Sequence, residues 1–575
     1  MALIATSTDP NANVSATTDP KEAADLEQNH EKANTTVTTT IEQELHSQEQ
    51  NASEITETRI KKSSSFKLAF VGIAASLFVF QLDATCLGIA LPTIAGDLNG
   101  TSLESFWASL AYTLCGLTMQ SIWVSISDAF GRKPPLYVSL GLFFIGSVVF
   151  AVAKNMGTII AGRVLQGLGG GGIDVLAQVI LADMTTLEER SKYIGLMAIP
   201  TAIGNIMGPI VGALFSTFVS WRWIAWINLP IIATGTLLVF FFLKLRSIPL
   251  EATLAKNLNR LDWIGMALIV AGVTLFVVPL SWAGSLFPWA SWQTLFPLLL
   301  GATLLVVFVI YETKPAAPIM PHRLFHTRTG NAALMGGFIH GMILVSLLQY
   351  MPLLLQAVEL ESAISSAVSL LPTVIVSVFI AAVSMMMVPF FGGYVWLLRL
   401  SWVILTLGTG LLALFKLRSP LSMRYGLPIL WGTGVSLLRL NLLPVQASVK
   451  NVNDTGLAIG QLLTIRMFGG LVGLTISSAI FNNVFSESIS STAVQLTGAL
   501  APLKDASNAV SFIETLRSLD ISSTALDEIL SIYLKCFRTI FYTMTGFGGL
   551  GLLTSMLLRE IDLKGHGLGN QRFEE

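Results

Sequence analysis

The feature that most constrains this sequence is a series of apolar runs, each about as long as a membrane is thick. A hydrocarbon core of about 30 Å needs roughly 20 apolar residues in a helix. Scanning the chain at that length predicts fourteen membrane spans. They lie near 67–91, 105–127, 135–154, 157–181, 193–217, 223–245, 262–284, 293–312, 331–356, 363–388, 394–416, 425–448, 455–484 and 537–559.

The composition excludes most other classes of protein. Hydrophobic residues make up 53% of the 575 residues and charged residues only 12%, whereas a soluble chain carries about 25% charged residues. This argues against a soluble enzyme, a nucleic-acid binder or a secreted disulfide scaffold, and we predict an all-α polytopic membrane protein. A net charge of −1 offers no basic field to a polyanion. The three cysteines suggest neither a disulfide framework nor a metal site.

The basic residues set the expected topology. Lys and Arg are concentrated in alternate loops, beginning with the flank of the first span, and such loops face the cytosol. An even number of spans with both termini inside fits this pattern. Residues 1–62 are polar and contain no signal-peptide run, so we expect a disordered cytosolic tail followed by an uncleaved signal-anchor. Residues 561–575 form the second cytosolic tail.

Two outer segments are predicted from this topology. Residues 485–535 form a long outer loop, and its apolar positions Leu526, Ile529, Leu530 and Tyr533 suggest a helix lying on the membrane surface. The first outer loop contains the glycosylation sequon that begins at Asn99. We expect the other sequons to be inert because they lie in the cytosolic tail, at Asn13, Asn34 and Asn51.

Ionisable residues inside the spans are the candidate functional groups, because a charge at membrane depth is costly. In span four, Arg163 and Asp174 are eleven residues apart, so they share a helix face about 16 Å apart along the axis. Gln166 and Gln178 lie near that face, which we interpret as lining a water-filled cavity. The alternative is packing through small residues, with the charges as structural pairs.

Depth along the spans suggests further partners. Asp83 and Arg163 lie at similar depth in the outer half, where they can pair, and a proton or a cationic substrate would break that pair; the alternative is a purely structural pair. Arg439 and Arg466 also share a depth and would repel unless an anion or carboxylate lies between them. Alternatively, each arginine points to a different neighbour. His340 and Gln349 are weaker candidates.

The loop between spans two and three resembles a motif of a known family. The loop from Ser127 to Pro134 reads SDAFGRKP and resembles the loop-2/3 motif of the major facilitator superfamily. Gly131 permits a tight turn, Arg132 and Lys133 are expected at the lipid surface, and Asp128 can form an ion pair. The chain departs from the motif at Val124 and Ala129, which we expect to weaken the charge network of the inner gate.

Three further stretches resemble the same family in the right order. Asp83 lies in a first-helix motif that ends at Pro92. Arg163 begins a fourth-helix motif whose arginine is linked to proton transfer. Residues 204–213 resemble the antiporter motif, with its hinge residues Gly204, Gly208, Pro209 and Gly212 and with Ala213 replacing the final glycine. A Gly-Pro step suits a rocking hinge because it permits close packing and bending.

The span count specifies the branch of the family that the chain resembles. Fourteen spans are typical of the drug:proton antiporters, in which two helices separate two six-helix halves built from inverted repeats. The corresponding segments are 63–248 for the first half, 249–315 for the inserted helices and 316–560 for the second half. Arg466 also begins an R-x-x-G-G element resembling one in fungal drug exporters. The loop around 388–400 is the poorest match.

The resemblance implies a proton-driven exporter of small, largely apolar organic compounds such as drugs, toxins or secondary metabolites. The chain has no ATP-binding loop, so the expected energy source is a proton gradient without any cofactor. The expected partners are a small-molecule substrate and the lipid bilayer, with no nucleic acid, and the protein is expected to be a plasma-membrane monomer. The alternatives are a nutrient or amino-acid transporter, a vacuolar location, or a transport-dead sensor.

Overall fold

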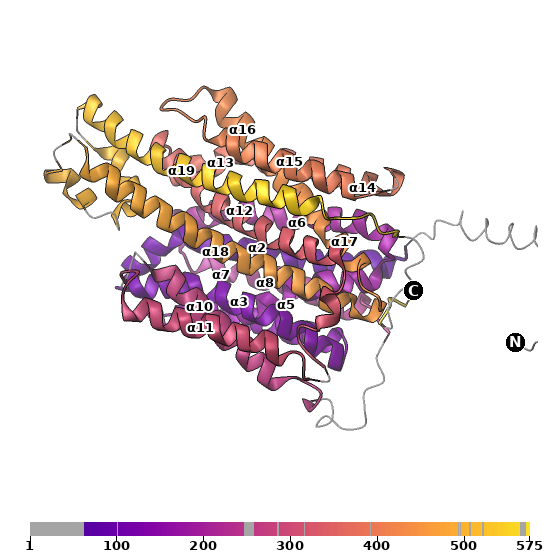
Figure 1. Ribbon diagram of the computed structural model, residues 1–575. Helices are drawn as coiled ribbons and strands as arrows, with labels where there is room; N and C mark the ends of the chain where they lie inside the picture. The colour runs from indigo at the N-terminus through magenta and orange to yellow at the C-terminus, as the bar shows by residue number, and fades with distance from the viewer. Residues whose placement is uncertain are drawn as a thin grey trace, which may run out of the picture. The chain divides into compact units, whose positions relative to one another are not determined.

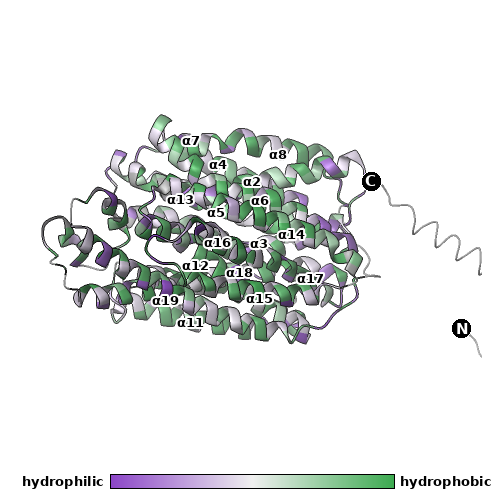
Figure 2. Ribbon diagram, turned by 90° about the horizontal axis from the view of Figure 1, so that it is seen from above, coloured by the Kyte–Doolittle hydropathy of each residue, from purple (hydrophilic) through white to green (hydrophobic). Residues whose placement is uncertain are grey.

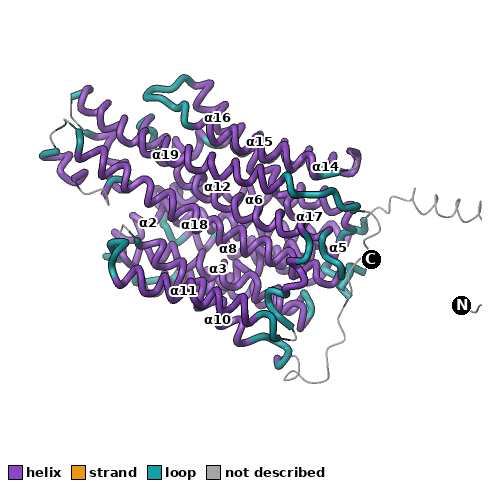
Figure 3. Tube along the Cα trace, in the orientation of Figure 1, coloured by secondary structure: helices purple, strands orange, loops and turns teal. Residues whose placement is uncertain are grey.

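The computed structural model describes residues 62–574, except 101, 247–257, 284–286, 316, 392, 493, 495, 505–507, 520–521 and 564–570. The predicted N-terminal tail therefore lies almost entirely outside the described residues. Secondary structure in the described part is helical, apart from two isolated β-bridges (Figure 3). Each of the fourteen predicted spans coincides with at least one helix.

The helices fall into three groups along the chain. The first group comprises α2 Ser64–Asp97, α3 Ser102–Phe130, α4 Lys133–Ala151, α5 Met156–Met184, α6 Leu187–Leu214, α7 Trp223–Trp226 and α8 Asn228–Phe242. The inserted pair is α10 Trp263–Trp282 and α11 Trp292–Tyr311. The last group comprises α12 Arg328–Val358, α13 Ala363–Ser369, α14 Leu371–Phe391, α15 Val395–Leu412, α16 Leu421–Leu437, α17 Leu442–Ala447, α18 Thr455–Ser490 and α19 Ser523–Ser555.

Within the described residues, twelve helical segments are long and apolar enough to cross a membrane. The other two predicted spans correspond to α3 and α19, which have 29 and 33 residues but are less apolar. Polar residues such as Gln120 in α3 and Arg538 in α19 lower their hydropathy. Length and composition thus support twelve spans, and the count of fourteen stays a prediction.

The helices of each group pack mainly with one another (Figure 1). In the first group, α2 packs against α6 and α8, while α5 packs against both α3 and α4. In the last group, α12 packs against α18 and α19, and α16 packs against α14 and α15. The inserted helices α10 and α11 pair with each other, and α10 contacts α3 and α18. Apolar residues predominate along these helices (Figure 2).

Glycines of α5 allow the neighbouring helices to approach its backbone. A Cβ atom added at Gly167 would lie 2.6 Å from the carbonyl oxygen of Tyr112 in α3. On the α4 side, a Cβ at Gly162 would lie 2.8 Å from the backbone nitrogen of Phe150. These separations are shorter than ordinary non-bonded contacts, which are about 3.5–4.0 Å. Gly162 and Gly167 therefore serve close helix packing.

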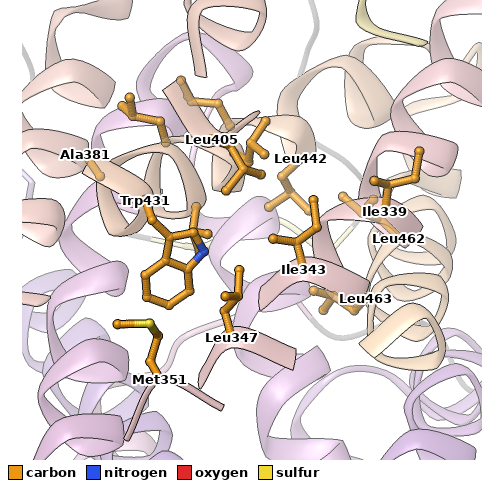
Figure 4. Packing of buried hydrophobic residues seen from close by; sticks show 14 of the residues in the cluster. Ile339, Ile343, Leu347, Met351, Ala381, Leu405, Trp431, Leu442, Leu462 and Leu463 are labelled. Atoms are coloured by element: carbon orange, nitrogen blue, oxygen red, sulfur yellow. The ribbon is translucent and has the colours of Figure 1, made fainter. Parts of the chain in front are cut away.

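The last group has its own apolar core. Trp431 of α16 lies among Leu347 and Met351 of α12 and Leu405 of α15 (Figure 4). All four side chains are buried. This core connects helices that are far apart in sequence, so it fixes the positions of α12 and of the break between α16 and α17, which carry cavity residues.

The predicted surface helix within 485–535 is wrong. The residues around Ile529 and Tyr533 form the first turns of α19, and both side chains are completely buried. Their apolar face packs against an extension of α18, where the rings of Phe485 and Tyr533 are 5.1 Å apart. An amphipathic pattern predicts that one face is covered, but it does not distinguish lipid from a neighbouring helix.

The described end of the chain returns to the first group of helices. Phe573 forms an antiparallel bridge with Leu245, just after α8. Its ring also lies edge-on to Phe66 at the start of α2, at 5.6 Å between centroids. The start of the first span and the described C-terminal residues therefore lie together, as expected if both termini face the same side.

Candidate functional site

The predicted pair between Asp83 and Arg163 is present. Arg163 Nη1 in α5 donates to Asp83 Oδ2 in α2 at 2.5 Å. The two side chains are about 1% and 3% exposed, so the ion pair is shielded from solvent. A buried pair of this kind needs further hydrogen bonds to offset its desolvation.

Those hydrogen bonds come from helices on several sides. Asn228 Nδ2 in α8 donates to Asp83 Oδ1 at 2.8 Å, and Gln166 Nε2 donates to the same oxygen at 3.3 Å. Gln166 Oε1 also accepts from Arg163 Nη1 at 2.9 Å. The guanidinium lies over the ring of Tyr112 in α3, 4.1 Å from its centroid. We call Asp83, Tyr112, Arg163, Gln166 and Asn228 the Asp83 cluster.

Almost all buried polar atoms of the Asp83 cluster have a hydrogen-bond partner. Within the described residues, only Arg163 Nε and Asn228 Oδ1 lack a hydrogen-bond partner among its buried polar atoms. Asn228, the first residue of α8, was not predicted. Hydropathy alone could not show that this amide faces Asp83.

Asp174 lies in a different environment. Gln120 Nε2 in α3 donates to Asp174 Oδ2 at 2.8 Å. Asp174 and Gln178 line a cavity of about 50 Å³ together with residues of the last helix group. We call this space the central cavity. Its polar and charged lining residues are Gln81, Asp174, Gln178, Thr201, His340, Arg439, Asn441 and Arg466.

Both predicted arginines reach the central cavity. Arg439 lies in the 3₁₀ turn between α16 and α17, and Arg466 lies in α18. Asp174 interacts electrostatically with both. In the part of the chain that the structure describes, neither guanidinium makes a hydrogen bond or an ion pair within 4 Å. Of the two alternatives for these arginines, the shared cavity favours a common carboxylate, Asp174, over separate neighbours.

Two predicted cavity residues lie elsewhere. Gln166 is completely buried in the Asp83 cluster, so the interpretation that this whole face of span four lines one cavity is wrong. Arg163 and Asp174 are on the same side of α5, but at different heights: Arg163 contacts Asp83, whereas Asp174 lines the central cavity. Gln349 in α12 is exposed and does not line the central cavity. His340 does line it, and within the described residues its Nε2 has no hydrogen-bond partner.

The inner-gate loop is built around Arg132. Gly131 has a φ of 85°, a conformation that glycine adopts readily, so the predicted turn is confirmed. Arg132 donates to Asp183 Oδ2 at 2.8 Å and to Ser127 Oγ at 2.7 Å, and it also binds Asp128. Arg132 is buried, so its predicted position at the lipid surface is wrong, whereas Lys133 remains partly exposed.

Arg132 has two carboxylate partners despite the departures from the loop motif at Val124 and Ala129. Asp183, at the end of α5, was not predicted and supplies the second carboxylate for Arg132. Val124 packs against Gly460 of α18, where an added Cβ would lie 2.8 Å from a Val124 methyl carbon. Val124 therefore contributes to contact between the two helix groups.

Direct hydrogen bonds join the two helix groups at this end. Arg190 Nη1 in α6 donates to Gln446 Oε1 in α17 at 2.7 Å. The hydroxyls of Ser121 in α3 and Thr464 in α18 are 2.9 Å apart. Beyond the last helix group, Gln571 near the chain end also accepts a hydrogen bond from the Arg132 backbone nitrogen at 3.0 Å. The groups are therefore in contact between the inner-gate loop and the central cavity.

The antiporter-motif helix lies against α2. Added Cβ atoms at Gly204 and Gly208 would come within 2.6 and 2.7 Å of backbone oxygens of α2. Gly212 faces Cys86 of α2 in the same way, and α6 contains Pro200 as well as Pro209. The predicted close packing is thus present along the helix that carries Asp83.

A carboxyl pair, Asp262 and Glu312, lies just outside the helical residues of α10 and α11, at the N-cap of α10 and the C-cap of α11. Asp262 Oδ1 accepts from the backbone nitrogen of Gly265, and Glu312 Oε2 accepts from that of Met320, both at 2.9 Å. Burial, opposed by the Met320 hydrogen bond and assisted by the neighbouring Asp262, raises the pKa of Glu312 to about 7. This titratable pair was not predicted.

Asn99, the predicted glycosylation site, follows α2 and is exposed with a φ of 50°. It lies at the opposite end of α2 from Phe66. The geometry leaves the side chain accessible.

Comparison with known proteins agrees with this architecture. Residues 73–474 match the family model described as Major Facilitator Superfamily. The chain is 71% identical to the MFS-type transporter sphD of Aspergillus fumigatus, over 92% of this chain and 91% of that protein. It is 31% identical to the efflux pump FUS6 of Gibberella moniliformis, over 88% and 89% of the two chains.

A solved structure supports the fold independently. The proton:xylose symporter XylE has a TM-score of 0.54 with this chain at 12% identity, over 88% of this chain and 98% of that one. The chain therefore belongs to the major facilitator superfamily, a family of membrane transporters rather than enzymes.

Proposed function

We propose that this protein is a fourteen-span, proton-coupled exporter of small, largely apolar organic compounds. The main support is the central cavity, because both helix groups line it with polar and apolar side chains. Alternating access requires a site between two units that can move relative to each other. The name of the FUS6 relative, an efflux pump, supports the outward direction.

The size of the central cavity suggests how the site is used. Sites for drug-sized molecules measure about 300–1,000 Å³, whereas this cavity is about 50 Å³. An organic substrate would therefore require the helix groups to separate. The contacts of Arg190 with Gln446 and of Ser121 with Thr464 would break as the inner side opens.

Proton coupling is assigned to Asp83 and Arg163, with Asp174 as the alternative carboxyl. Protonation of Asp83 would weaken its ion pair with Arg163 and thus its links to α5 and α8. Helix α2 carries Asp83 and packs against α6, which contains the proposed hinge at Gly208 and Pro209. A movement of α2 after protonation of Asp83 can therefore reach the hinge. Asp174 would act instead if the proton enters through the central cavity.

The test is transport in proteoliposomes that contain the purified protein and an imposed pH gradient. A panel of fluorescent apolar dyes should accumulate on the side expected for exchange with protons. Asp83→Asn and Arg163→Gln should lose gradient-driven movement but retain dye binding. Asp97→Asn is the matched control, because Asp97 is the last residue of α2 and accepts a hydrogen bond from Trp221 outside the Asp83 cluster.

The outcomes separate the alternatives. Unchanged pumping by Asp83→Asn, with loss in Asp174→Asn, would move the coupling site to the central cavity. Movement of the dyes together with protons would contradict export and favour nutrient uptake. We also propose the plasma membrane as the location, which cell-surface labelling against a vacuolar marker would test.

A further inference from the structure

We propose that the central cavity binds the carboxylate of an anionic substrate between Arg439 and Arg466, which makes the exported compounds apolar acids. This inference rests on the proposed transport function and specifies its substrate class.

The charge balance of the central cavity supports this assignment. Its titratable lining residues are Asp174, His340, Arg439 and Arg466. With Asp174 ionised and His340 neutral, the lining carries one excess positive charge. An uncompensated charge at membrane depth is costly and indicates a function. A monoanion would balance this charge, whereas a cation would add a second positive charge.

The geometry of the two arginines also favours an anion. Each guanidinium reaches the central cavity, and neither is held by a hydrogen bond or ion pair in the described part of the chain. The buried arginines Arg163 and Arg132, by contrast, are paired with Asp83 and Asp183. A guanidinium presents a planar set of donors that matches a carboxylate.

His340 supplies an independent sign of a polar ligand. It lines the central cavity at 2% exposure, and its Nε2 has no hydrogen-bond partner within the described residues. A buried polar atom without a partner is costly unless a ligand or water satisfies it. A substrate oxygen could accept from this nitrogen in one tautomer, next to the arginines.

The apolar part of the cavity suggests the rest of the substrate. Leu77, Leu181, Ile194, Met197, Leu438, Leu442 and Leu462 line it beside the charged residues. The present volume has room for a head group, and an apolar body would extend along these side chains when the helix groups separate. The expected ligand is therefore an acid with a hydrophobic body.

The experiment compares three probes with the same apolar body: 4-phenylbutanoate, 4-phenylbutanol and 4-phenylbutylammonium. Dissociation constants are measured on the full-length protein in lipid nanodiscs, with empty nanodiscs subtracted. The carboxylate should bind at least about tenfold more tightly than the alcohol, because hydrogen bonds to charged groups contribute that much. The ammonium should bind most weakly.

Variants assign the preference to its residues. Arg439→Gln and Arg466→Gln should each reduce carboxylate affinity about tenfold and leave alcohol affinity unchanged, which a merely misfolded variant would not do. Arg466→Lys should keep part of the preference because it keeps the charge. Asp174→Asn should keep or strengthen it. Arg418→Gln is the matched control, because the Arg418 side chain is 83% exposed.

The results distinguish this inference from the proposed function. Equal affinity for the three probes, or tighter binding of the ammonium, would overturn the inference. If such a protein still exports neutral apolar dyes, the proposed function stands. A carboxylate preference that depends on both arginines, in a protein that moves no substrate, would support the site and contradict export.

Discussion

Substitution of Gly208 offers the sharpest test of the contact between α6 and α2. A Cβ at this position would collide with the hydroxyl oxygen of Thr85, and it would lie 2.7 Å from the carbonyl oxygen of Leu82 and 2.9 Å from Thr85 Cβ. Ordinary contacts are about 3.5–4.0 Å, so α2 would have to retreat by about 1 Å. Overpacking of this kind costs about 1–3 kcal/mol, against a gain of up to about 1 kcal/mol from replacing a helical glycine.

We therefore expect Gly208→Ala to lower the apparent melting temperature and efflux, and Gly208→Val to abolish efflux in protein that still reaches the membrane. Gly88 of α2 is the matched control, because an added Cβ there meets nothing within 4 Å. Gly88→Ala should keep both properties. The assays are thermal unfolding in detergent and dye efflux from proteoliposomes. Wild-type melting and efflux in both Gly208 variants would refute the close-contact reasoning.

Three further predictions concern the parts outside the cavity. The folded-state pKa of Glu312 is about 7, above its ordinary 4.5, so stability present below pH 4.5 should fall as the pH rises to about 7. Melting curves across that range should show a smaller fall for Glu312→Gln, and equal falls would contradict the assignment. Glycosidase should shift the wild type only through Asn99, and a shift that persists in Asn99→Gln would place another sequon outside. Tags at both termini should resist external protease on intact cells, whereas cleavage of one tag alone would contradict an even number of spans.

The positions of the helices could be predicted from the sequence because each span needs a long apolar run. All fourteen predicted segments have helices, although apolar content alone supports twelve as spans. The breaks within them were harder to locate. The 3₁₀ turn that carries Arg439 lies inside a continuous apolar run, and hydropathy does not register a change of helix type.

The candidate site could be predicted in part. Charges in apolar runs identified Asp83, Arg163 and Asp174, and depth alone placed Asp83 beside Arg163. The partners Asn228 and Gln120 were missed because uncharged amides are common in membrane helices and carry little signal. Arg163 and Asp174 have similar angular positions on α5, so the sequence could not show that one belongs to the Asp83 cluster and the other to the central cavity. That difference depends on which other helices lie next to each residue.

The glycines of α5 have a mechanical consequence. Where backbones touch without intervening side chains, one helix cannot slide or roll against the next without a steric collision. Helices α3, α4 and α5 meet in this way at Gly162 and Gly167. The three helices should therefore tilt together as one rigid unit. Arg163, which is paired with Asp83, and Asp174, which lines the central cavity, would keep fixed positions within this unit. Protonation or ligand binding at one of these side chains would then move the other by rotating the whole three-helix unit. It would not require a chain of rearranged contacts between the two sites.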